Sequence, residues 1–179
     1  TQQQGSFNGQ SVRYSAIVQE HFFSLDSNHA PAVSAITTSY IKESGTSTTQ
    51  RPVLFVFNGG PGASSSPLHM SAFGPKRFVL EKDSNVLVEN KYSLLDIADL
   101  VFVDPPGTGF TRVFDIKAAG GYWDVMGDAQ LFIELIKKWK KENKRESAPL
   151  FLCGESYGTA RAAVILGNAE DLPVAGGIF

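Results

Sequence analysis

The sequence contains one cysteine and three histidines, and both shortages restrict the chemistry available to it. Cys153 cannot form a disulfide within the chain, and a cysteine-based metal site is excluded for the same reason. Because Cys153 lies in an apolar run, we expect a buried and inert thiol. The histidines are His21, His29 and His69, so the last 110 of the 179 residues contain none.

Long apolar runs and a strong net charge are also missing. No apolar run approaches the ~18 residues of a membrane span, so a transmembrane helix is not expected. The formal net charge is −2, which gives no reason to expect binding to nucleic acid or to an anionic membrane surface. Residues 1–6 are polar and lack the basic start and apolar stretch of a signal peptide.

The first 50 residues have the sequence pattern of antiparallel strands. Residues 11–25 and 32–41 alternate apolar and polar side chains, as half-buried strands do. Residues 26–31 read as the turn between them, and residues 44–50 form a polar loop. We therefore expect an antiparallel meander at the start of a sheet.

The pattern of apolar and polar residues changes after Pro52. Residues 53–57, 100–103 and 150–153 are short, almost continuously apolar runs, typical of parallel strands covered on both faces. A helix is expected between the last two runs, over about residues 121–144, with a solvated face formed by Lys137, Lys138, Lys140 and Lys141. This alternation predicts the α/β class, as a three-layer sandwich in which the meander of residues 1–50 leads into a parallel portion over residues 51–179.

The end of the chain, residues 173–179, predicts a further strand of the sheet. An apolar strand at a chain end would be left as a half-covered edge. We therefore expect residues 1–179 to be the amino-terminal part of a single larger α/β domain, truncated and marginally stable by itself.

The pentapeptide Gly154-Glu155-Ser156-Tyr157-Gly158 is the most informative stretch. It follows an apolar strand and precedes a helix-forming segment, residues 159–166, which is the context of a nucleophile elbow. Such a turn is tight enough to require glycines, and its strain exposes the serine hydroxyl. The alternative is an ordinary strand-to-helix turn in which Ser156 caps the helix.

A second glycine-rich loop follows the run at residues 53–57. It reads Asn58-Gly59-Gly60-Pro61-Gly62, at the end of a parallel strand where ligands of open α/β sheets bind. A phosphate-binding loop is excluded because no Gly-Lys-Ser/Thr follows at the required spacing. A plain turn remains the alternative to an oxyanion-binding loop, whose other amide would come from Tyr157.

Three segments together carry a family resemblance. Residues 58–65, 104–110 and 154–158 resemble, in order and spacing, the Asn-Gly-Gly-Pro-Gly, Asp-x-Pro-x-Gly-x-Gly-Phe and Gly-Glu-Ser-Tyr motifs of the serine carboxypeptidase family. The resemblance covers residue 7 to the end. It implies an α/β-hydrolase fold and cleavage of C-terminal residues from peptides without metal or cofactor. It also favours a secreted or periplasmic location.

The resemblance also implies roles for individual residues. Ser156 would be the nucleophile that forms an acyl-enzyme, with the amides of Gly60 and Tyr157 as the oxyanion hole. Asn58, the Gly59 amide and Glu155 would recognise the free C-terminal carboxylate of a peptide substrate.

Two departures from the family pattern bear on specificity. Ala72 stands where the family usually has a second glutamate, so the carboxylate site is altered. His69 could take part of that role, although a structural histidine is the simpler expectation. Ala63 replaces the cysteine of the usual loop, and this change, with Arg161 after the elbow, is similar to bacterial members.

A catalytic histidine is missing where the fold's usual order requires it. In α/β hydrolases the acid and then the histidine follow the serine, but residues 157–179 contain no histidine. Recruiting His21 or His29 would break that order, and Glu170 and Asp171 follow the elbow too closely to orient a distant base. We expect this chain to be inactive alone. An esterase or acyltransferase on the same scaffold, and a catalytically silent binding fragment, remain alternatives.

Overall fold

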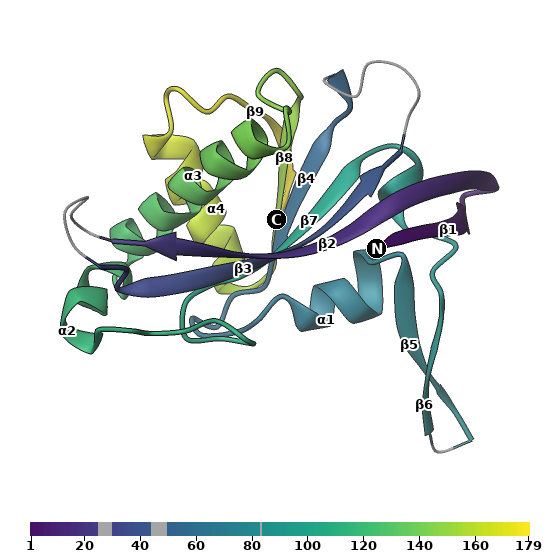
Figure 1. Ribbon diagram of the computed structural model, residues 1–179, viewed down its shortest axis with the longest axis horizontal. Coiled ribbons are helices and arrows are strands. Elements are labelled where there is room, and N and C mark those ends of the chain that lie inside the picture. The colour runs from purple at the N-terminus through teal and green to yellow at the C-terminus, as the bar shows by residue number, and fades with distance from the viewer. Residues whose placement is uncertain (25–29, 44–49, 83) are drawn as a thin grey trace.

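A mixed sheet of seven strands organises the chain. The computed structural model describes residues 1–24, 30–43, 50–82 and 84–179, so most of the predicted turn at 26–31, including His29, and of the loop at 44–50 lies outside the described residues. The strand order is β1-β2-β3-β7-β4-β8-β9 (Figure 1). The bounds are β1 (Gln2–Phe7), β2 (Gln10–Phe23), β3 (Val33–Lys42), β4 (Val53–Phe57), β7 (Asp99–Asp104), β8 (Leu150–Gly154) and β9 (Val174–Ile178).

The predicted meander is confirmed, and the structure extends it by one strand. β1, β2 and β3 pair antiparallel, and β3 then joins β7 antiparallel. The remaining pairs, β7–β4, β4–β8 and β8–β9, are parallel. The polar composition of β1 hid it from sequence reasoning, because an exposed edge strand pairs through its backbone and needs no apolar face.

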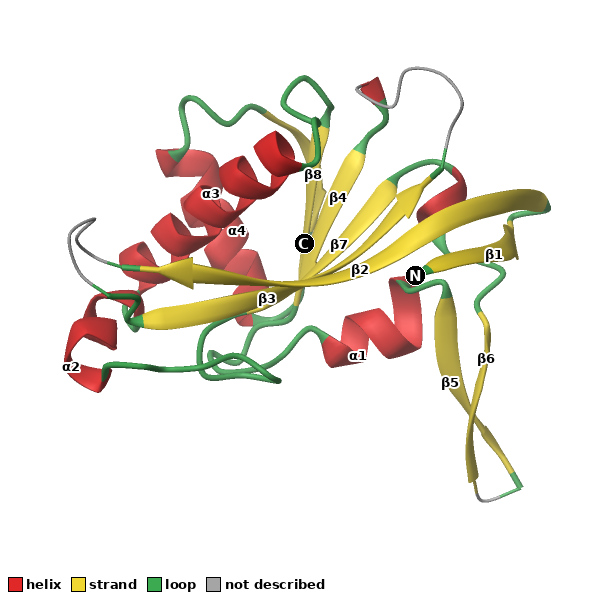
Figure 2. Cartoon of the chain, viewed as in Figure 1, coloured by secondary structure: helices red, strands yellow, loops and turns green. Residues whose placement is uncertain are grey.

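Alternate side chains of β4 serve two hydrophobic layers. Val53, Phe55 and Phe57 pack with α3 (Val125–Glu142) and α4 (Tyr157–Asn168), whereas Leu54 and Val56 face the opposite layer. That second layer includes α1 (Ser66–Leu68), the π-helical turn η2 (His69–Phe73) and the short η3 (Leu94–Asp96). Figure 2 shows helices on both sides of the sheet, which confirms the three-layer α/β prediction.

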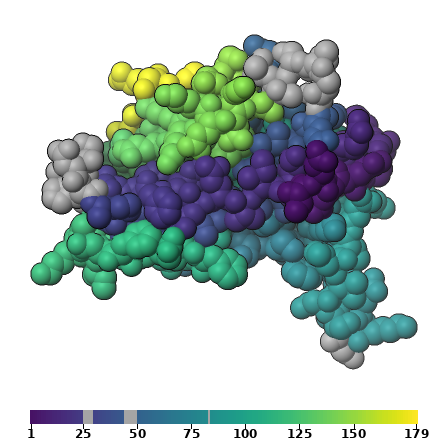
Figure 3. Space-filling model, in the orientation of Figure 1, coloured from purple at the N-terminus to yellow at the C-terminus, as the bar shows by residue number. Residues whose placement is uncertain are grey.

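Two smaller features complete the fold. A twisted hairpin of β5 (Lys76–Glu81) and β6 (Ser84–Glu89), which sequence reasoning missed, projects from the body as a separate arm (Figure 3). The turns α2 (Ile116–Ala119) and η4 (Gly120–Tyr122) lead into α3. None of the helices among the described residues is both long and apolar enough to cross a membrane.

The lysine face of α3 differs from the prediction at one position. Lys138 and Lys141 are exposed, and Lys137 forms an ion pair of 2.7 Å with Asp171. Lys140 is only 5% exposed, and its Nζ donates to the Ala148 carbonyl at 2.9 Å. Burial lowers the pKa of this ammonium. The solvated-face prediction is therefore wrong for Lys140, whose long stem packs inside while its charged end finds a carbonyl.

Candidate active site

The three motif loops meet at one edge of the sheet. They follow β7, β4 and β8, which are neighbours in the sheet and run parallel. Phe57 at the end of β4 lies beside Gly154 at the end of β8, so the two glycine-rich loops leave the sheet at the same level. The carboxyl ends of adjacent parallel strands are where open α/β sheets bind ligands.

Ser156 occupies a strained turn between β8 and α4. Its φ and ψ are 57° and −125°, a conformation that non-glycine residues rarely adopt. Its side chain is exposed and makes no helix-capping hydrogen bond, so the capping alternative finds no support. A Cβ on Gly154 would lie 2.3 Å from the Gly158 carbonyl oxygen, which explains why the turn needs glycine there. Strain of this kind at an exposed hydroxyl is characteristic of functional sites.

The loop after β4 lies directly against this elbow. A Cβ on Gly59 would lie 2.4 Å from the Tyr157 amide nitrogen, so only glycine allows the two backbones to approach this closely. Gly60 has a φ of +102°, in the region that favours glycine. The Ala63 amide closes the loop by donating to the Gly59 carbonyl at 3.2 Å. The structure thus places the Gly59 backbone against Tyr157, with Gly60 next along the same loop.

Asn58 links the two loops through its side chain. Its Nδ2 donates to Glu155 Oε2 at 3.0 Å, and its Oδ1 accepts from the Leu68 amide at 3.2 Å. Because the backbone N–H of Leu68 can only donate, the side chain of Asn58 must present its NH₂ group to Glu155. The polar residues assigned to carboxylate recognition therefore form one hydrogen-bonded pair beside Ser156.

Asp104, at the end of β7, fixes the far end of the glycine-rich loop. Its Oδ1 accepts from both the amide and the hydroxyl of Ser65, each at 2.7 Å. Gly109 lies nearby with a φ of +54°, in the region that favours glycine, and an added Cβ would lie 2.4 Å from Asp104 Oδ2. The motif at residues 104–110 thus contributes by supporting the loop after β4.

A buried ion pair beneath the elbow was not predicted. Arg161 on α4 is 1% exposed and donates to both carboxylate oxygens of Asp128 on α3, at 2.7 and 3.2 Å. Its third contact is the Asn58 carbonyl, at 2.9 Å. The only sequence signal was an arginine within a mostly apolar helical segment, which does not identify its partner.

A cavity of about 260 Å³ opens beside the elbow. It is lined by Pro61, Gly62, Pro105, Pro106, Tyr122, Trp123, Asp128, Leu131, Tyr157 and Arg161. Burial, followed by the nearby Asp128 carboxylate, raises the pKa of Tyr157, so its phenol stays neutral at physiological pH. This cavity places aromatic and proline side chains next to the residue that follows the nucleophile.

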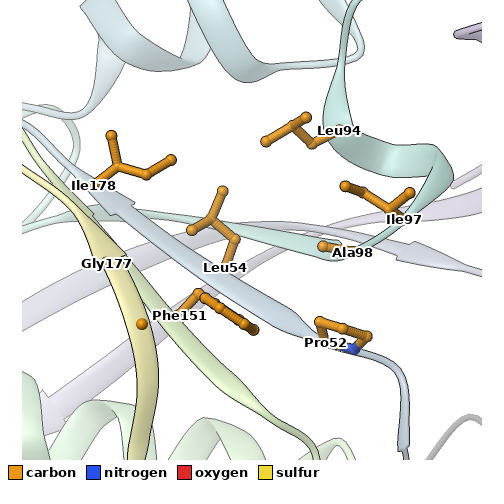
Figure 4. A pocket seen from close by; sticks show the side chains of 9 residues that line it. Pro52, Leu54, Leu94, Ile97, Ala98, Phe151, Gly177 and Ile178 are labelled. Atoms are coloured by element: carbon orange, nitrogen blue, oxygen red, sulfur yellow. The ribbon is translucent and has the colours of Figure 1, made fainter.

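A larger cavity, of about 480 Å³, lies away from the elbow on the other layer of the sheet. Figure 4 shows its apolar lining, which includes Leu54, Leu94, Ile97, Phe151 and Ile178. Its lining offers no nucleophile and no charged side chain, so size alone does not identify the reactive site.

The two histidines within the described residues have structural partners. His21 is fully buried in β2 with Nε2 2.9 Å from Thr37 Oγ1. His69 Nε2 lies 2.8 Å from the Tyr40 hydroxyl, and its ring stacks on Phe102 with centroids 4.2 Å apart. Burial lowers the pKa of each imidazole to about 4.

Ala72 stands where the family usually has a second glutamate. Among the described residues, no contact near Ala72 provides a replacement for that carboxyl group. Ala72 is exposed in η2, and its carbonyl accepts from Asn90 Nδ2 at 2.7 Å. His69, in the same turn, is committed to Tyr40. This contact agrees with a structural role for His69. None of the contacts of His69 with the described residues supports a role in carboxylate binding.

Comparison with known proteins identifies carboxypeptidases and a carboxypeptidase-like protein among the relatives of this chain. The family model described as serine carboxypeptidase matches residues 39–165, which include all three motif loops. A pheromone-processing carboxypeptidase KEX1 of Podospora anserina is 40% identical over 110 residues, covering 60% of this chain and 18% of the relative. Serine carboxypeptidase-like 20 of Arabidopsis thaliana is 32% identical over 150 residues, covering 74% and 28%. The chain thus spans less than a third of the length of these relatives.

Solved structures agree on the fold. The prohormone-processing carboxypeptidase Kex1(delta)p of Saccharomyces cerevisiae superposes with a TM-score of 0.62 and 24% identity, over 88% of this chain and 35% of that one. The peroxisomal α/β-hydrolase Lpx1 of the same yeast gives 0.52 and 13%, over 89% and 41%. The predicted α/β-hydrolase fold is confirmed.

Proposed function

The chain belongs to the serine carboxypeptidase family, and we propose that the protein containing it releases C-terminal residues from peptides through an acyl-enzyme on Ser156. The observation that carries this proposal is the contact between the loop after β4 and the elbow. It brings the Gly59 backbone against the amides that follow the strained and exposed Ser156, and the hydrogen bond between Asn58 and Glu155 joins the same two loops.

The chemistry follows from that arrangement. Ser156 Oγ attacks the last peptide carbonyl, and the oxygen of the tetrahedral intermediate accepts hydrogen bonds from the amides of Gly60 and Tyr157. The C–N bond then breaks, the departing amine takes a proton, and water later hydrolyses the acyl ester. The proton carrier is a histidine that residues 157–179 do not contain, so we assign the general base to another part of the protein.

Carboxylate recognition separates a carboxypeptidase from an esterase on the same scaffold. The Asn58 NH₂ group and the Gly59 amide are donors, and Glu155 can share a proton with a bound carboxyl group. An esterase that acts on simple acyl esters has no carboxylate to bind, so these residues favour a carboxypeptidase. We further propose that residues 1–179 form the amino-terminal part of one α/β-hydrolase domain, with a peptide bearing a free C-terminal carboxylate as substrate.

The test uses the full-length protein and three matched substrates. We expect a blocked dipeptide acid to be cleaved with a higher kcat/KM than its C-terminal amide or a simple acyl ester. Ser156→Ala should lower kcat by several orders of magnitude without a comparable change in binding. Faster turnover of the ester than of the peptide acid, with transfer to an added alcohol, would instead indicate an acyltransferase.

A further inference from the structure

We infer that Arg161 is a positioning residue: by holding the backbone carbonyl of Asn58, it directs the Gly59 amide toward the terminal carboxylate of the substrate. The inference rests on the proposed function, which assigns the Gly59 amide to that carboxylate. Arg161 lies outside the three motif loops. It is buried beneath them and contacts the loop after β4 through the Asn58 carbonyl.

Arg161 is held rigidly in that layer. Its two-point contact with Asp128, at 2.7 and 3.2 Å, matches the planar fork of a guanidinium to a carboxylate. Aromatic rings confine it further, because its Cζ lies 4.3 Å from the centroid of Phe132, 5.3 Å from Tyr157 and 5.4 Å from Phe57. The side chains of Arg161 and Asp128 are only 1% and 13% exposed.

The third donor connects this rigid group to the active-site loop. Arg161 Nη1 donates to the Asn58 carbonyl at 2.9 Å. That carbonyl and the N–H of Gly59 belong to the same planar peptide unit, in which the two groups of a trans bond point in opposite directions. Fixing the carbonyl toward the buried guanidinium therefore fixes the Gly59 N–H on the side away from it.

The Gly59 amide is free to serve a ligand. Within the described part of the chain, the Gly59 N–H donates to no backbone carbonyl in the turns and loops. The Gly59 carbonyl accepts a hydrogen bond from the Ala63 amide. The Gly59 Cα also lies against the Tyr157 amide nitrogen, as the 2.4 Å approach of an added Cβ shows. A donor held at that position would face a substrate bound across the elbow.

Stability alone does not account for this arrangement. A buried ion pair gains little over well-packed apolar residues, because desolvating both charges offsets their attraction. A lysine could neutralise Asp128, but its single ammonium lacks the fork that reaches Asp128 and Asn58 together. The arginine is needed where one side chain must join α3, α4 and the loop after β4.

The experiment measures binding to the full-length Ser156→Ala protein, in which no turnover disturbs the equilibrium. The probes are an N-acetylated dipeptide with a free C-terminal carboxylate and the same dipeptide as its C-terminal amide, titrated by calorimetry. We expect the parent protein to prefer the acid. Adding Arg161→Met should weaken binding of the acid about tenfold, which matches the loss of one hydrogen bond to a charged group, and change the amide less than twofold.

Arg145→Met is the matched control. Arg145 is also buried and pairs with Asp99, at 3.1 Å, but Asp99 begins β7 at the end of the sheet opposite the elbow. This variant should lose stability without losing preference for the acid. If Arg161→Met does not fold, Arg161→Lys keeps a cation beside Asp128 and should show the same loss of preference.

The outcomes separate the two claims. A folded Arg161 variant that keeps the full preference for the acid overturns this inference and leaves the proposed function standing. Equal losses in the Arg161 and Arg145 variants would also overturn it, because they would reflect general destabilisation. If the parent protein itself does not prefer the acid, the proposed function and this inference both fail.

Discussion

The side chains of Asn58 and Glu155, 97 residues apart in the sequence, meet in a hydrogen bond of 3.0 Å. This contact joins the loop after β4 to the elbow after β8 beside Ser156. Asn58 Oδ1 accepts a hydrogen bond from the Leu68 amide, and this fixes the orientation of the Asn58 side chain. Its NH₂ group therefore faces Glu155. The result is a polar pair that combines an amide group with a carboxyl group next to Ser156 in the elbow.

In the proposed function, the carboxyl group of Glu155 lies beside the terminal carboxylate of the bound peptide. A peptide carboxylate beside it is disfavoured when both carry a negative charge, so one of them must hold a proton for tight binding. In the full-length protein, KM for a peptide acid should rise about tenfold between pH 5 and pH 8. Glu155→Gln keeps an acceptor for Asn58 and removes the charge, so its KM should be nearly flat over this range. A pH-independent KM in the wild-type protein would contradict the assignment.

The contact between Gly59 and the elbow predicts the effect of a single methyl group. In Gly59→Ala the Cβ would lie 2.4 Å from the Tyr157 nitrogen and 2.7 Å from the Gly158 nitrogen, both backbone atoms that cannot rotate away. We expect a loss of about 1–3 kcal/mol in the free energy of unfolding and at least a tenfold loss of kcat. Chemical denaturation and steady-state kinetics would measure both.

Gly167→Ala is the control for that substitution. Gly167 lies in α4, the helix that follows the elbow, and an added Cβ would meet nothing within 4 Å. Alanine is the better helix former by about 1 kcal/mol, so this variant should be slightly more stable and fully active. Equal behaviour of the two variants would show that the close approach of Gly59 to the elbow is not important.

Sequence reasoning succeeded where a local pattern encodes the geometry. The elbow and the loop after β4 each concentrate glycines at positions where a Cβ would collide with backbone, and the central strands are short apolar runs. It failed where a contact depends on residues far apart. Arg161 and Asp128 are 33 residues apart and belong to no motif, so their pairing emerges only when α3 packs on α4. Lys140 looked like its exposed neighbours because an amphipathic pattern does not reveal a carbonyl within reach.

The bond between Asp104 and Ser65 predicts coupled losses of stability. Asp104 Oδ1 accepts from both the amide and the hydroxyl of Ser65, so Ser65→Ala removes one of two hydrogen bonds and Asp104→Ala removes both. We expect costs of about 1 and 3 kcal/mol respectively, with the double variant near the value for Asp104→Ala alone. Urea unfolding of the four proteins in this cycle measures the coupling.

A surface carboxylate provides the comparison for Asp104. Asp171 pairs with Lys137 at 2.7 Å but its side chain is 76% exposed. Asp171→Ala should leave the free energy of unfolding nearly unchanged, because water screens an exposed pair. In the cycle of Asp104 and Ser65, a double variant whose loss of unfolding free energy equals the sum of the two single losses would contradict the shared hydrogen bonds.

The buried His21 predicts a loss of stability in acid. Burial, and then the charge of Lys138, lowers its pKa from 6.5 to about 4, while Glu142 acts in the opposite direction. Between these values the unfolded chain binds a proton that the folded chain does not, so stability falls as the pH drops from 6.5 towards 4. His69 contributes with the same sign, because burial lowers its pKa to about 4 as well.

Replacing His21 should remove its part of that slope. His21→Gln retains a group that can donate to Thr37 Oγ1 but does not titrate, so the drop in unfolding free energy from pH 7 to pH 4.5 should shrink by about 2 kcal/mol. Thr37→Val is the control, since it removes the 2.9 Å contact and keeps the imidazole. Its stability should be lower at every pH with the wild-type slope retained. Parallel pH profiles for His21→Gln and the wild-type protein would show that His21 is not a neutral buried group in the folded chain.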